Sequence, residues 1–388
     1  MKLMTNNINT NFLKYQSCNR CIMDTSAKDI VFDDNGFCNF CSEFLIRQDQ
    51  AKENNLDLDK LILAIKSDGK NKKYDCIIGI SGGVDSCYVL IKAVEHGLRP
   101  LAVHMDNGWN SELTQNNISN LIRTLKVDLY THVINWEEYR NLQKAFFEAN
   151  VIDIELLYDN AMAAVNYKIA DKFNVKYILS GMNTSTEGFK IPSDWSWFKN
   201  DARNIKCIAQ KFSNQKIKTF PTFGTFNFIN YELIKKIKWI LFPDYFNFNK
   251  DLAIKELEIK SNFKKYPYKH YENVFTRFYQ GYILPKKFGV DKRKLHLSNL
   301  IISNQMKRED ALKIMQQSSY QNLEDERKDK EYFLKKMQWN ENKLDDYLSQ
   351  KEISHSFYGS EKKLWNTLES IYKKLKKVKT LFKAMLHS

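Results

Sequence analysis

Short apolar runs alternate with longer amphipathic segments through the first half of the chain. The apolar runs occupy residues 74–80, 101–105, 129–134 and 175–180. The segments between them, which have the apolar spacing of helices, occupy 85–96, 111–125 and 156–173. Buried strands separated by helices form a parallel, doubly wound sheet, which binds ligands beyond the carboxyl ends of its strands. The pattern therefore predicts an α/β fold with a ligand site at that edge.

Beyond residue 300 the pattern becomes helical. Polar helices are predicted at 307–317 and 324–350, and an amphipathic helix begins near Leu364. Its apolar positions keep a seven-residue register, at Leu364, Leu368, Ile371, Leu375, Val378, Phe382 and Met385. Its other faces carry Lys373, Lys374, Lys376, Lys377, Lys379 and Lys383. Three interpretations stay open for this helix, namely packing on its own domain, pairing with itself or a partner, and binding to a membrane surface.

Composition excludes two broad classes of protein. The 388 residues are 43% hydrophobic, which is too apolar for a disordered chain. No apolar run approaches the roughly 18 residues of a membrane span. The first ten residues lack the apolar stretch of a signal peptide. We therefore expect a soluble, cytoplasmic protein without an integral membrane segment.

The formal net charge of +14 suggests an anionic partner such as nucleic acid. The excess is confined to two segments, however. Residues 201–300 hold 20 basic and 8 acidic side chains, and residues 361–388 hold 8 and 2. The first half of the chain is nearly neutral, so the charge does not cover the predicted sheet.

Four of the seven cysteines form two C-x-x-C pairs, at Cys18, Cys21, Cys38 and Cys41. This spacing predicts a four-thiolate zinc site with a structural role, because a closed tetrahedral site leaves no position for a substrate. Disulfides and reduced core cysteines are the alternatives, and the apparent lack of a secretion signal disfavours disulfides. Residues 30–37 between the pairs are predicted to form a strand and a turn.

The first predicted strand leads directly into Ser81-Gly82-Gly83-Val84-Asp85-Ser86. Two glycines let backbone amides approach a phosphate closely, and the helix that follows points its positive N-terminus at the same place. Asp85 would repel a bare phosphate, so it implies Mg²⁺ or a positioning role. An ordinary strand–helix turn is the alternative interpretation of the segment.

This hexapeptide resembles the pyrophosphate loop of the PP-loop ATP pyrophosphatase superfamily, which cleaves ATP between its α and β phosphates. Together with the cysteine pairs, further runs resemble the N-acetyl sugar amidotransferases of surface-polysaccharide (O-antigen) biosynthesis. These runs are 22–24, 32–33, 106–112, 201–205, 266–272 and 275–285. The likeness covers about residues 15–320. It implies three parts: a zinc module with a linker helix over 1–70, the ATP pyrophosphatase domain over 71–225, and a basic, mainly helical substrate or partner domain over 226–388.

The resemblance implies that ATP activates the acetamido group of a sugar, which is then converted to an acetamidino group. An adenylated imidate would form, pyrophosphate and AMP would be released, and Mg²⁺ would assist. The resemblance also suggests that a separate glutaminase with a cyclase-like subunit supplies the ammonia. Outside the zinc set only Cys76, Cys87 and Cys207 remain as nucleophiles, and none has the setting of a glutaminase cysteine.

Site residues follow from the same resemblance. Nucleotide binding is expected from Ser81, Gly82, Gly83, Val84, Asp85, Ser86, Asp106, Gly181 and Asn183. Catalytic roles are expected for Asp85, for Glu187, which would bind Mg²⁺ or accept a proton from ammonia, and for Arg203. Substrate binding is expected from Asp201, Arg203, Lys269, Arg277 and Tyr279. In the basic segment, arginines suit the phosphates of a nucleotide-linked sugar.

Two other functions compete with this one. Enzymes that thiolate tRNA or form lysidine share the pyrophosphate loop, and a charge of +14 suits RNA. Thiolation commonly relies on a reactive cysteine pair, and the three cysteines outside the zinc set form none. A zinc-module scaffold without activity would leave the intact loop unexplained. We therefore expect a sugar substrate and no nucleic acid, with homo-oligomerisation left open.

Overall fold

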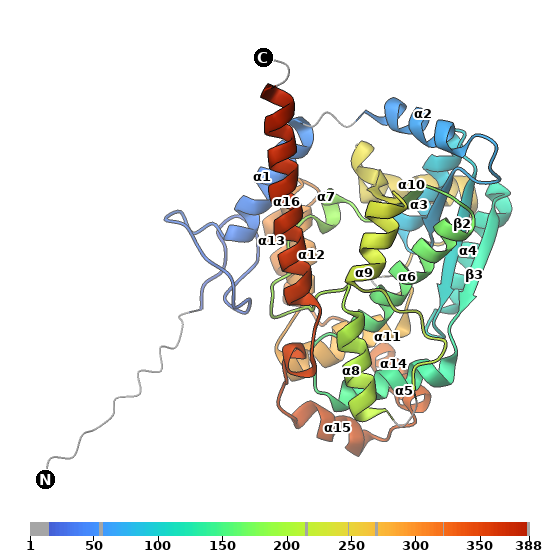
Figure 1. Ribbon diagram of the computed structural model, residues 1–388. Helices are drawn as coiled ribbons and strands as arrows, with labels where there is room; N and C mark the ends of the chain where they lie inside the picture. Colours follow the sequence, from blue (N-terminus) through green and yellow to red (C-terminus); the bar gives the residue numbers. More distant parts are fainter. Residues whose placement is uncertain are drawn as a thin grey trace, which may run out of the picture.

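The computed structural model contains a sheet of five parallel strands in the order β3-β2-β1-β4-β5 (Figure 1). The strands are β1 Cys76–Gly79, β2 Pro100–Asp106, β3 Asp128–Val133, β4 Tyr177–Ser180 and β5 Lys238–Leu241. The first four confirm the predicted strands. The structure describes residues 15–53, 57–213, 216–246, 248–267, 271–320 and 322–385.

The strand order places a topological switch point beside β1. From β1 the chain moves to β2 and β3 on one side, and it later returns to add β4 and β5 on the other. The crevice that forms where the order reverses is the usual ligand site of such sheets. The predicted phosphate loop follows β1, so the fold puts it at this crevice.

Both faces of the sheet are covered, which explains the continuous apolar run of β1. Ile77 faces one apolar core and Ile78 faces the other, and both side chains are completely buried. Helices on the Ile78 face are α2 Leu58–Gly69, α3 Val84–Glu95, α4 Glu112–Leu125 and α10 Lys250–Ser261. Helices whose residues join the other core are α5 Trp136–Glu148, α6 Leu156–Lys172 and α8 Ala202–Phe212. The helices expected at 85–96, 111–125 and 156–173 are confirmed as α3, α4 and α6.

The fifth strand is an addition to the predicted sheet. β5 pairs in parallel with β4, from Tyr177 beside Lys238 to Ser180 beside Leu241. Between the two strands lie α7 Thr184–Glu187, α8, α9 Thr225–Phe228 and a π-helical segment, η1, at Ile229–Ile234. A 3-10 turn, η2, follows β5 at Phe242–Tyr245. The sheet therefore extends past residue 225, where the sequence placed the end of the ATP-binding domain.

The rest of the chain is mainly helical, as predicted. Its elements are α11 Val274–Phe278, π-helical η3 Tyr279–Phe288, α12 Arg293–Ile302, α13 Arg308–Met315, α14 Leu323–Met337, α15 Glu341–Ser349, 3-10 turn η4 His355–Tyr358 and α16 Lys362–Met385. The helix predicted at 307–317 is confirmed as α13. The segment predicted at 324–350 is two helices, because Gln338 ends α14 in the left-handed conformation with φ 55°.

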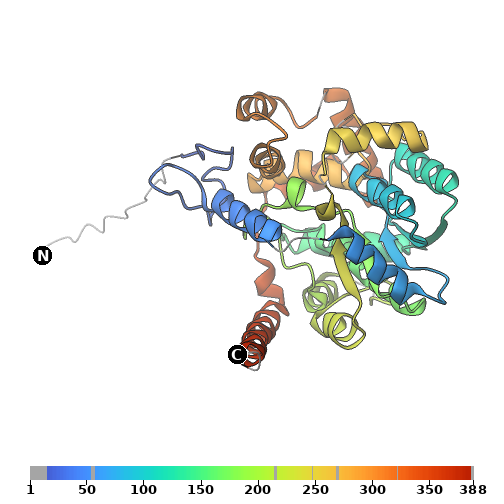
Figure 2. The ribbon, with the colours of Figure 1, turned by 90° about the horizontal axis from the view of Figure 1, so that it is seen from above.

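The N-terminal module lies against α12 and α13 (Figures 1 and 2). The Arg308 guanidinium donates to the carbonyl oxygens of Cys18 and Cys21, at 3.0 and 2.9 Å. Lys294 forms an ion pair with the buried Asp24 at 2.6 Å. The strand expected over 30–37 is reduced to an isolated bridge between Phe32 and Cys38. Helix α1, Asn39–Glu53, begins at the second cysteine pair.

Helix α16 confirms the predicted terminal helix and extends beyond the body of the molecule (Figures 1 and 2). Its first turns are anchored by Trp365, whose ring centroid lies 4.6 Å from that of Phe228. Leu364 and Ile371 are 39% and 48% exposed. The apolar positions from Leu375 onward, and the lysines among them, lie outside the residues whose side chains are described. In the described part of the chain, no helix has the length and apolar character needed to cross a membrane.

Candidate active site

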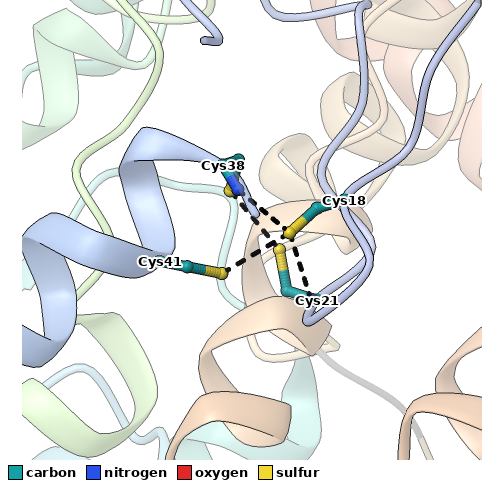
Figure 3. Close-up of side chains that lie close together, drawn as sticks. All are labelled: Cys18, Cys21, Cys38 and Cys41. Carbon is teal, nitrogen blue, oxygen red and sulfur yellow. Dashed lines mark hydrogen bonds between the residues drawn. The ribbon is translucent and has the colours of Figure 1, made fainter. Parts of the chain in front are cut away.

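The four predicted metal ligands converge on one point (Figure 3). Their sulfur atoms all lie within 4.8 Å of one another, and all four side chains are completely buried. The sulfur of Cys18 is 3.8 Å from that of Cys41, and the sulfur of Cys21 is 3.7 Å from that of Cys38. Zn–S bonds of about 2.3 Å give a tetrahedron with edges of about 3.8 Å. The donor set and its spacing therefore fit Zn²⁺, and the distances are too long for disulfides.

The predicted phosphate loop forms a tight turn between β1 and α3. The backbone N–H of Ser81 donates to the Ser86 hydroxyl at 3.2 Å, and the Ser86 hydroxyl donates to the Gly83 carbonyl at 3.1 Å. Gly82 has φ +82°, a conformation that glycine adopts without strain. Gly83 caps α3 without any side-chain hydrogen bond to the first turn. No N-cap side chain therefore competes with an anion for the amides of that turn.

Contacts from distant parts of the chain fix this loop. The Tyr266 hydroxyl donates to the Gly82 carbonyl at 2.7 Å. Gly181, directly after β4, approaches the first turn of α3 so closely that an added Cβ would lie 2.7 Å from the Ser86 nitrogen. The loop is thus held between the segment before Glu272 and the end of β4.

A cavity of about 680 Å³ lies over the loop, a size typical of small-molecule sites. Its lining includes Ser81, Gly83, Val84, Asp85, Ser86 and Gly181. Four carboxylates also line it, from Asp85, Glu187, Asp251 and Glu272. Oxygen ligands of this kind suit Mg²⁺, which usually keeps substrate phosphates among its ligands. The donor set thus fits Mg²⁺, which would neutralise phosphate charge in this cavity.

A larger cavity of about 1480 Å³ adjoins the first. The two share lining residues, which are Ser81, Tyr158, Met162, Met182, Glu187, Trp239, Glu272, His296 and Ile314. The larger one extends between the start of α6 and the helices that follow residue 272. A nucleotide over the loop would therefore meet a second substrate at this shared boundary.

The cations of the larger cavity have carboxylate partners. Lys199 contacts Asp153 and Asp159 at 2.7 and 2.9 Å. Lys292 contacts Glu155 at 2.8 Å, Arg293 contacts Asp291 at 2.7 Å, and Arg277 is paired with Asp329. Burial opposes ionisation of Asp153, but Lys199 and Lys292 outweigh it and hold the pKa of Asp153 below its ordinary value. The cavity is thus lined by compensated charges rather than by an excess of cations.

Several predicted nucleotide residues border the crevice without lining either cavity. Asp106 ends β2, and its carboxylate accepts from the Gly108 N–H at 2.9 Å. Asn183 is buried and caps α7 by accepting from the Thr186 N–H at 2.8 Å. Gly82 adopts the positive φ that the turn requires and lines neither cavity. The structure gives these residues roles in shaping the edge of the sheet.

The predicted substrate residues are dispersed. Of the five, Arg277 lines the larger cavity, where its guanidinium lies over the Tyr271 ring at 4.3 Å. Tyr279 is buried, and its hydroxyl donates to the Ile152 carbonyl. Lys269 lies outside the described residues.

The other two predicted substrate residues lie on α8, away from both cavities. Asp201 is completely buried and caps α8 by accepting from the Asn204 N–H at 3.0 Å. Arg203 is exposed on the first turn of the same helix. The structure therefore does not bring Arg203 to the phosphate loop, and it gives Asp201 a structural role.

Sequence reasoning did not select several polar residues that line these cavities, among them Asp159, Lys199, Glu272 and His296. Of these four, Glu272 alone lies in a motif-like run. Glu272 and His296 border both cavities. Glu272 ends the run 266–272, which is one of the runs that carry the family resemblance. Its place in that run could have identified it as a site residue.

Comparisons with known proteins agree with one part of this picture. Residues 272–372 match the family model of the LPS biosynthesis protein WbpG-like, C-terminal domain. This match confirms the predicted resemblance to surface-polysaccharide enzymes for that part of the chain. No curated protein matches the chain.

Among solved structures, the chain is similar to an NMN synthetase from Francisella tularensis, at 15% identity over 55% of this chain and 97% of that chain, with a TM-score of 0.28. It is similar to an NH3-dependent NAD synthetase from Campylobacter jejuni subsp. jejuni NCTC 11168, at 13% identity over 54% and 96%, with a TM-score of 0.27. A 4-thiouridine synthetase in a complex with RNA and bound ATP matches at 18% identity over 48% and 50%, with a TM-score of 0.25. TM-scores this low decide nothing about the chemistry of this chain.

Proposed function

We propose that this chain is an ATP-dependent, AMP-forming amidotransferase that converts the acetamido group of a sugar into an acetamidino group. One observation carries the proposal: the cavity over the phosphate loop is continuous in its lining with a larger cavity. Part of the shared lining, including Glu272 and His296, belongs to the segment that matches the WbpG-like domain. This arrangement supports a reaction between a nucleotide and a substrate of LPS biosynthesis.

The chemistry fits two adjoining sites. An amide carbonyl is a poor electrophile, so its oxygen first attacks the α-phosphorus of ATP, and pyrophosphate leaves. Ammonia then adds to the activated carbon, loses a proton, and AMP departs with the former amide oxygen. The protein's contribution is mostly positioning and charge stabilisation. Mg²⁺ held near Asp85 and Glu187 would neutralise the phosphates.

Glu187 has a suitable position for the second half of the reaction. It lies in the short helix α7 and borders both cavities. A carboxylate there can bind the metal or accept the proton that ammonia loses. Asp85, on the first turn of α3, lines the smaller cavity but not the larger one. Their positions support separate roles in activation and amination.

The three thiols outside the cysteine cluster support an external source of ammonia. Cys207 lies on α8 and lines neither cavity. Burial raises the pKa of the Cys87 thiol to about 12, and burial also raises the pKa of Cys76. Neither would form a thiolate near neutral pH, which a glutaminase or thiolation cysteine needs. We therefore infer that the chain acts in the cytoplasm, that a separate glutaminase delivers its ammonia, and that its substrate is a nucleotide-linked acetamido sugar rather than tRNA.

The test incubates the full chain with ATP, Mg²⁺, ammonium and a panel of acetamido sugars, each free and as a nucleoside diphosphate ester. We expect sugar-dependent release of AMP and a product lighter than its substrate, because NH replaces O. Release of AMP that depends on tRNA and not on any sugar would contradict the proposal. Equal rates with glutamine and with ammonium, for the purified chain alone, would contradict the separate glutaminase.

A further inference from the structure

Two carboxylates stand one helical turn apart at the start of α6 and line the larger cavity. Glu155 immediately precedes the helix, and Asp159 lies in its first turn. Residues four apart on a helix share a face, so both carboxylates are presented to the same region. Neither lines the cavity over the phosphate loop. They therefore face the second substrate and not the nucleotide.

Each carboxylate is oriented by its own partners. The side-chain amide of Gln280 donates to both oxygens of Glu155, at 3.0 and 2.9 Å, and Lys292 contacts one of them at 2.8 Å. Lys199 bridges Asp159 and Asp153. The Asp153 side chain is 1% exposed, whereas the Asp159 side chain is 38% exposed. Of the two carboxylates on Lys199, Asp159 is the one that a ligand can reach.

The charge states follow from the same contacts. Burial opposes ionisation of Glu155, but Lys292 outweighs it and lowers the pKa of Glu155. Burial and the neighbouring carboxylates raise the pKa of Asp159 despite Lys199. Each of the two carboxylates thus has a lysine beside it that balances its charge. They are therefore better suited to accept hydrogen bonds from neutral hydroxyl groups than to bind a further cation.

Aromatic side chains form much of the remaining wall. They include Tyr158, Phe223, Phe228, Trp239 and Phe275. Flat apolar faces beside oriented acceptors suit a ring with apolar C–H faces and an edge of hydroxyl groups. The cations of this cavity, in contrast, are already committed to carboxylates, so no excess of positive charge is left for a diphosphate.

We propose that Glu155 and Asp159 form a hydroxyl-binding subsite that recognises the ring of the acceptor sugar, and that a diphosphate carrier is not held by the cations of this cavity. The inference rests on the proposed function and adds the groups that select the sugar. Carboxylates accept from two neighbouring hydroxyls at once, so the subsite would favour particular ring stereochemistries.

The test compares Asp159→Ala with Asp171→Asn. Asp171 is on the same helix and also pairs with a lysine, Lys235, at 2.6 Å, but it lines neither cavity. Sugar binding is measured by the fluorescence of the chain, which has Trp239 in the cavity wall, and ATP binding by calorimetry. The ligands are the panel of acetamido sugars, free and esterified, and the nucleoside diphosphate alone.

We expect Asp159→Ala to weaken sugar binding about 10- to 100-fold, as for loss of a hydrogen bond to a charged group. ATP affinity and melting temperature should stay unchanged, since Lys199 keeps its ion pair with Asp153. Asp171→Asn should bind both ligands normally. Glu155→Gln should weaken sugar binding in the same direction.

Unchanged sugar affinity in Asp159→Ala would overturn the subsite, as would an equal loss of ATP affinity. A nucleoside diphosphate that binds the larger cavity as tightly as the complete sugar ester would overturn the statement about the carrier. Failure of the proposed function gives a different result: sugars would bind, with the expected effect of the variants, but no AMP would form. If no member of the panel binds the wild-type chain, the result contradicts both the proposed function and the subsite.

Discussion

Gly181 shows how closely the phosphate loop depends on single residues. A Cβ at this position would lie 2.7 Å from the Ser86 nitrogen and 2.9 Å from the Asp85 carbonyl carbon. Both are backbone atoms of the first turn of α3, so they cannot move without moving the loop.

We expect Gly181→Ala to lower the free energy of unfolding by about 1–3 kcal/mol and to weaken ATP binding. Urea unfolding and calorimetry would measure the two effects. Gly83→Ala is the matched control, because its Cβ would meet only side-chain atoms, at 3.3 and 3.9 Å. It should cost less stability while still obstructing phosphate. Equal destabilisation by both variants would contradict the close approach as the cause.

A second prediction concerns a buried histidine. Burial lowers the pKa of His355 to about 3, although Asp153 opposes the shift. Its ring accepts from the Asp153 N–H at 3.1 Å and lies 2.8 Å from the Asn204 side-chain oxygen. The folded protein therefore keeps His355 neutral, whereas an unfolded chain protonates it near pH 6.5.

Stability should consequently fall as the pH drops from about 6.5 toward 3, because the unfolded state binds the extra proton in that window. This residue would contribute at most about 1.4 kcal/mol per pH unit. We expect His355→Gln to show a shallower loss of unfolding free energy between pH 7 and pH 5. Identical pH slopes for variant and wild type would argue against a neutral, buried imidazole.

At the scale of elements, the four-cysteine N-terminal module and α12 depend on each other. Lys294 and Ser298 of α12 contact Asp24 and Ile22 of the module, and His296 of the same helix borders both cavities. Loss of a bound metal would therefore disturb α12 and the position of His296 in the cavity lining, even though the cysteines themselves line neither cavity.

We expect Cys38→Ser to abolish stoichiometric zinc binding and to lower both melting temperature and sugar-dependent AMP release, since structural zinc contributes folding energy directly. Metal analysis and thermal melting would measure this. Cys207→Ser is the control, because Cys207 is outside the cluster and should leave zinc content unchanged. A zinc-free Cys38→Ser protein with wild-type stability would show that the site is dispensable.

Element positions were predictable where periodicity was strong. The alternation of short apolar runs with helical segments predicted the buried strands β1, β2 and β4, the more exposed edge strand β3, and helices α3, α4 and α6. β5 was not predicted, because its apolar run, Trp239-Ile240-Leu241, is short and lies outside the regular alternation of strands and helices over residues 74–186. The break between α14 and α15 depends on a single backbone angle at Gln338, which composition does not reveal.

The site was predictable only where it is local in sequence. The proposed phosphate loop is one contiguous hexapeptide, so its residues are recognisable together in the sequence. Asp159 and Lys199 meet through tertiary structure, and each looks like an ordinary surface residue in its own segment. Asp201 belongs to a run that resembles the sugar enzymes, yet its carboxylate caps a helix.

On the scale of the whole molecule, Glu361 joins the C-terminal helix to the body. Its carboxylate accepts from the backbone N–H groups of Arg203 and Thr225, at 3.2 and 2.6 Å. Those residues begin α8 and α9, so one side chain caps two helices that precede it by more than a hundred residues.

We expect Glu361→Ala to destabilise the protein by about 1–3 kcal/mol, because two backbone donors lose a charged acceptor. Glu369→Ala, within α16 itself, should cost no more than about 0.5 kcal/mol, since its pair with Lys373 is exposed. Denaturant unfolding would compare the two. A Glu369 variant as unstable as the Glu361 variant would mean that helix α16 acts through its charge rather than through this cap.

The smaller cavity also constrains how the protein is made. The loop lies near residue 81, but the walls above it include Tyr266, Glu272, His296 and Ile314. A ribosome that adds about 5–20 residues per second would need about 10–50 s to pass from the loop to the last of these walls. For that interval the cavity over the loop of the nascent chain would be incomplete. If the chain binds a nucleotide there, as we propose, that binding can stabilise the fold only near the end of synthesis.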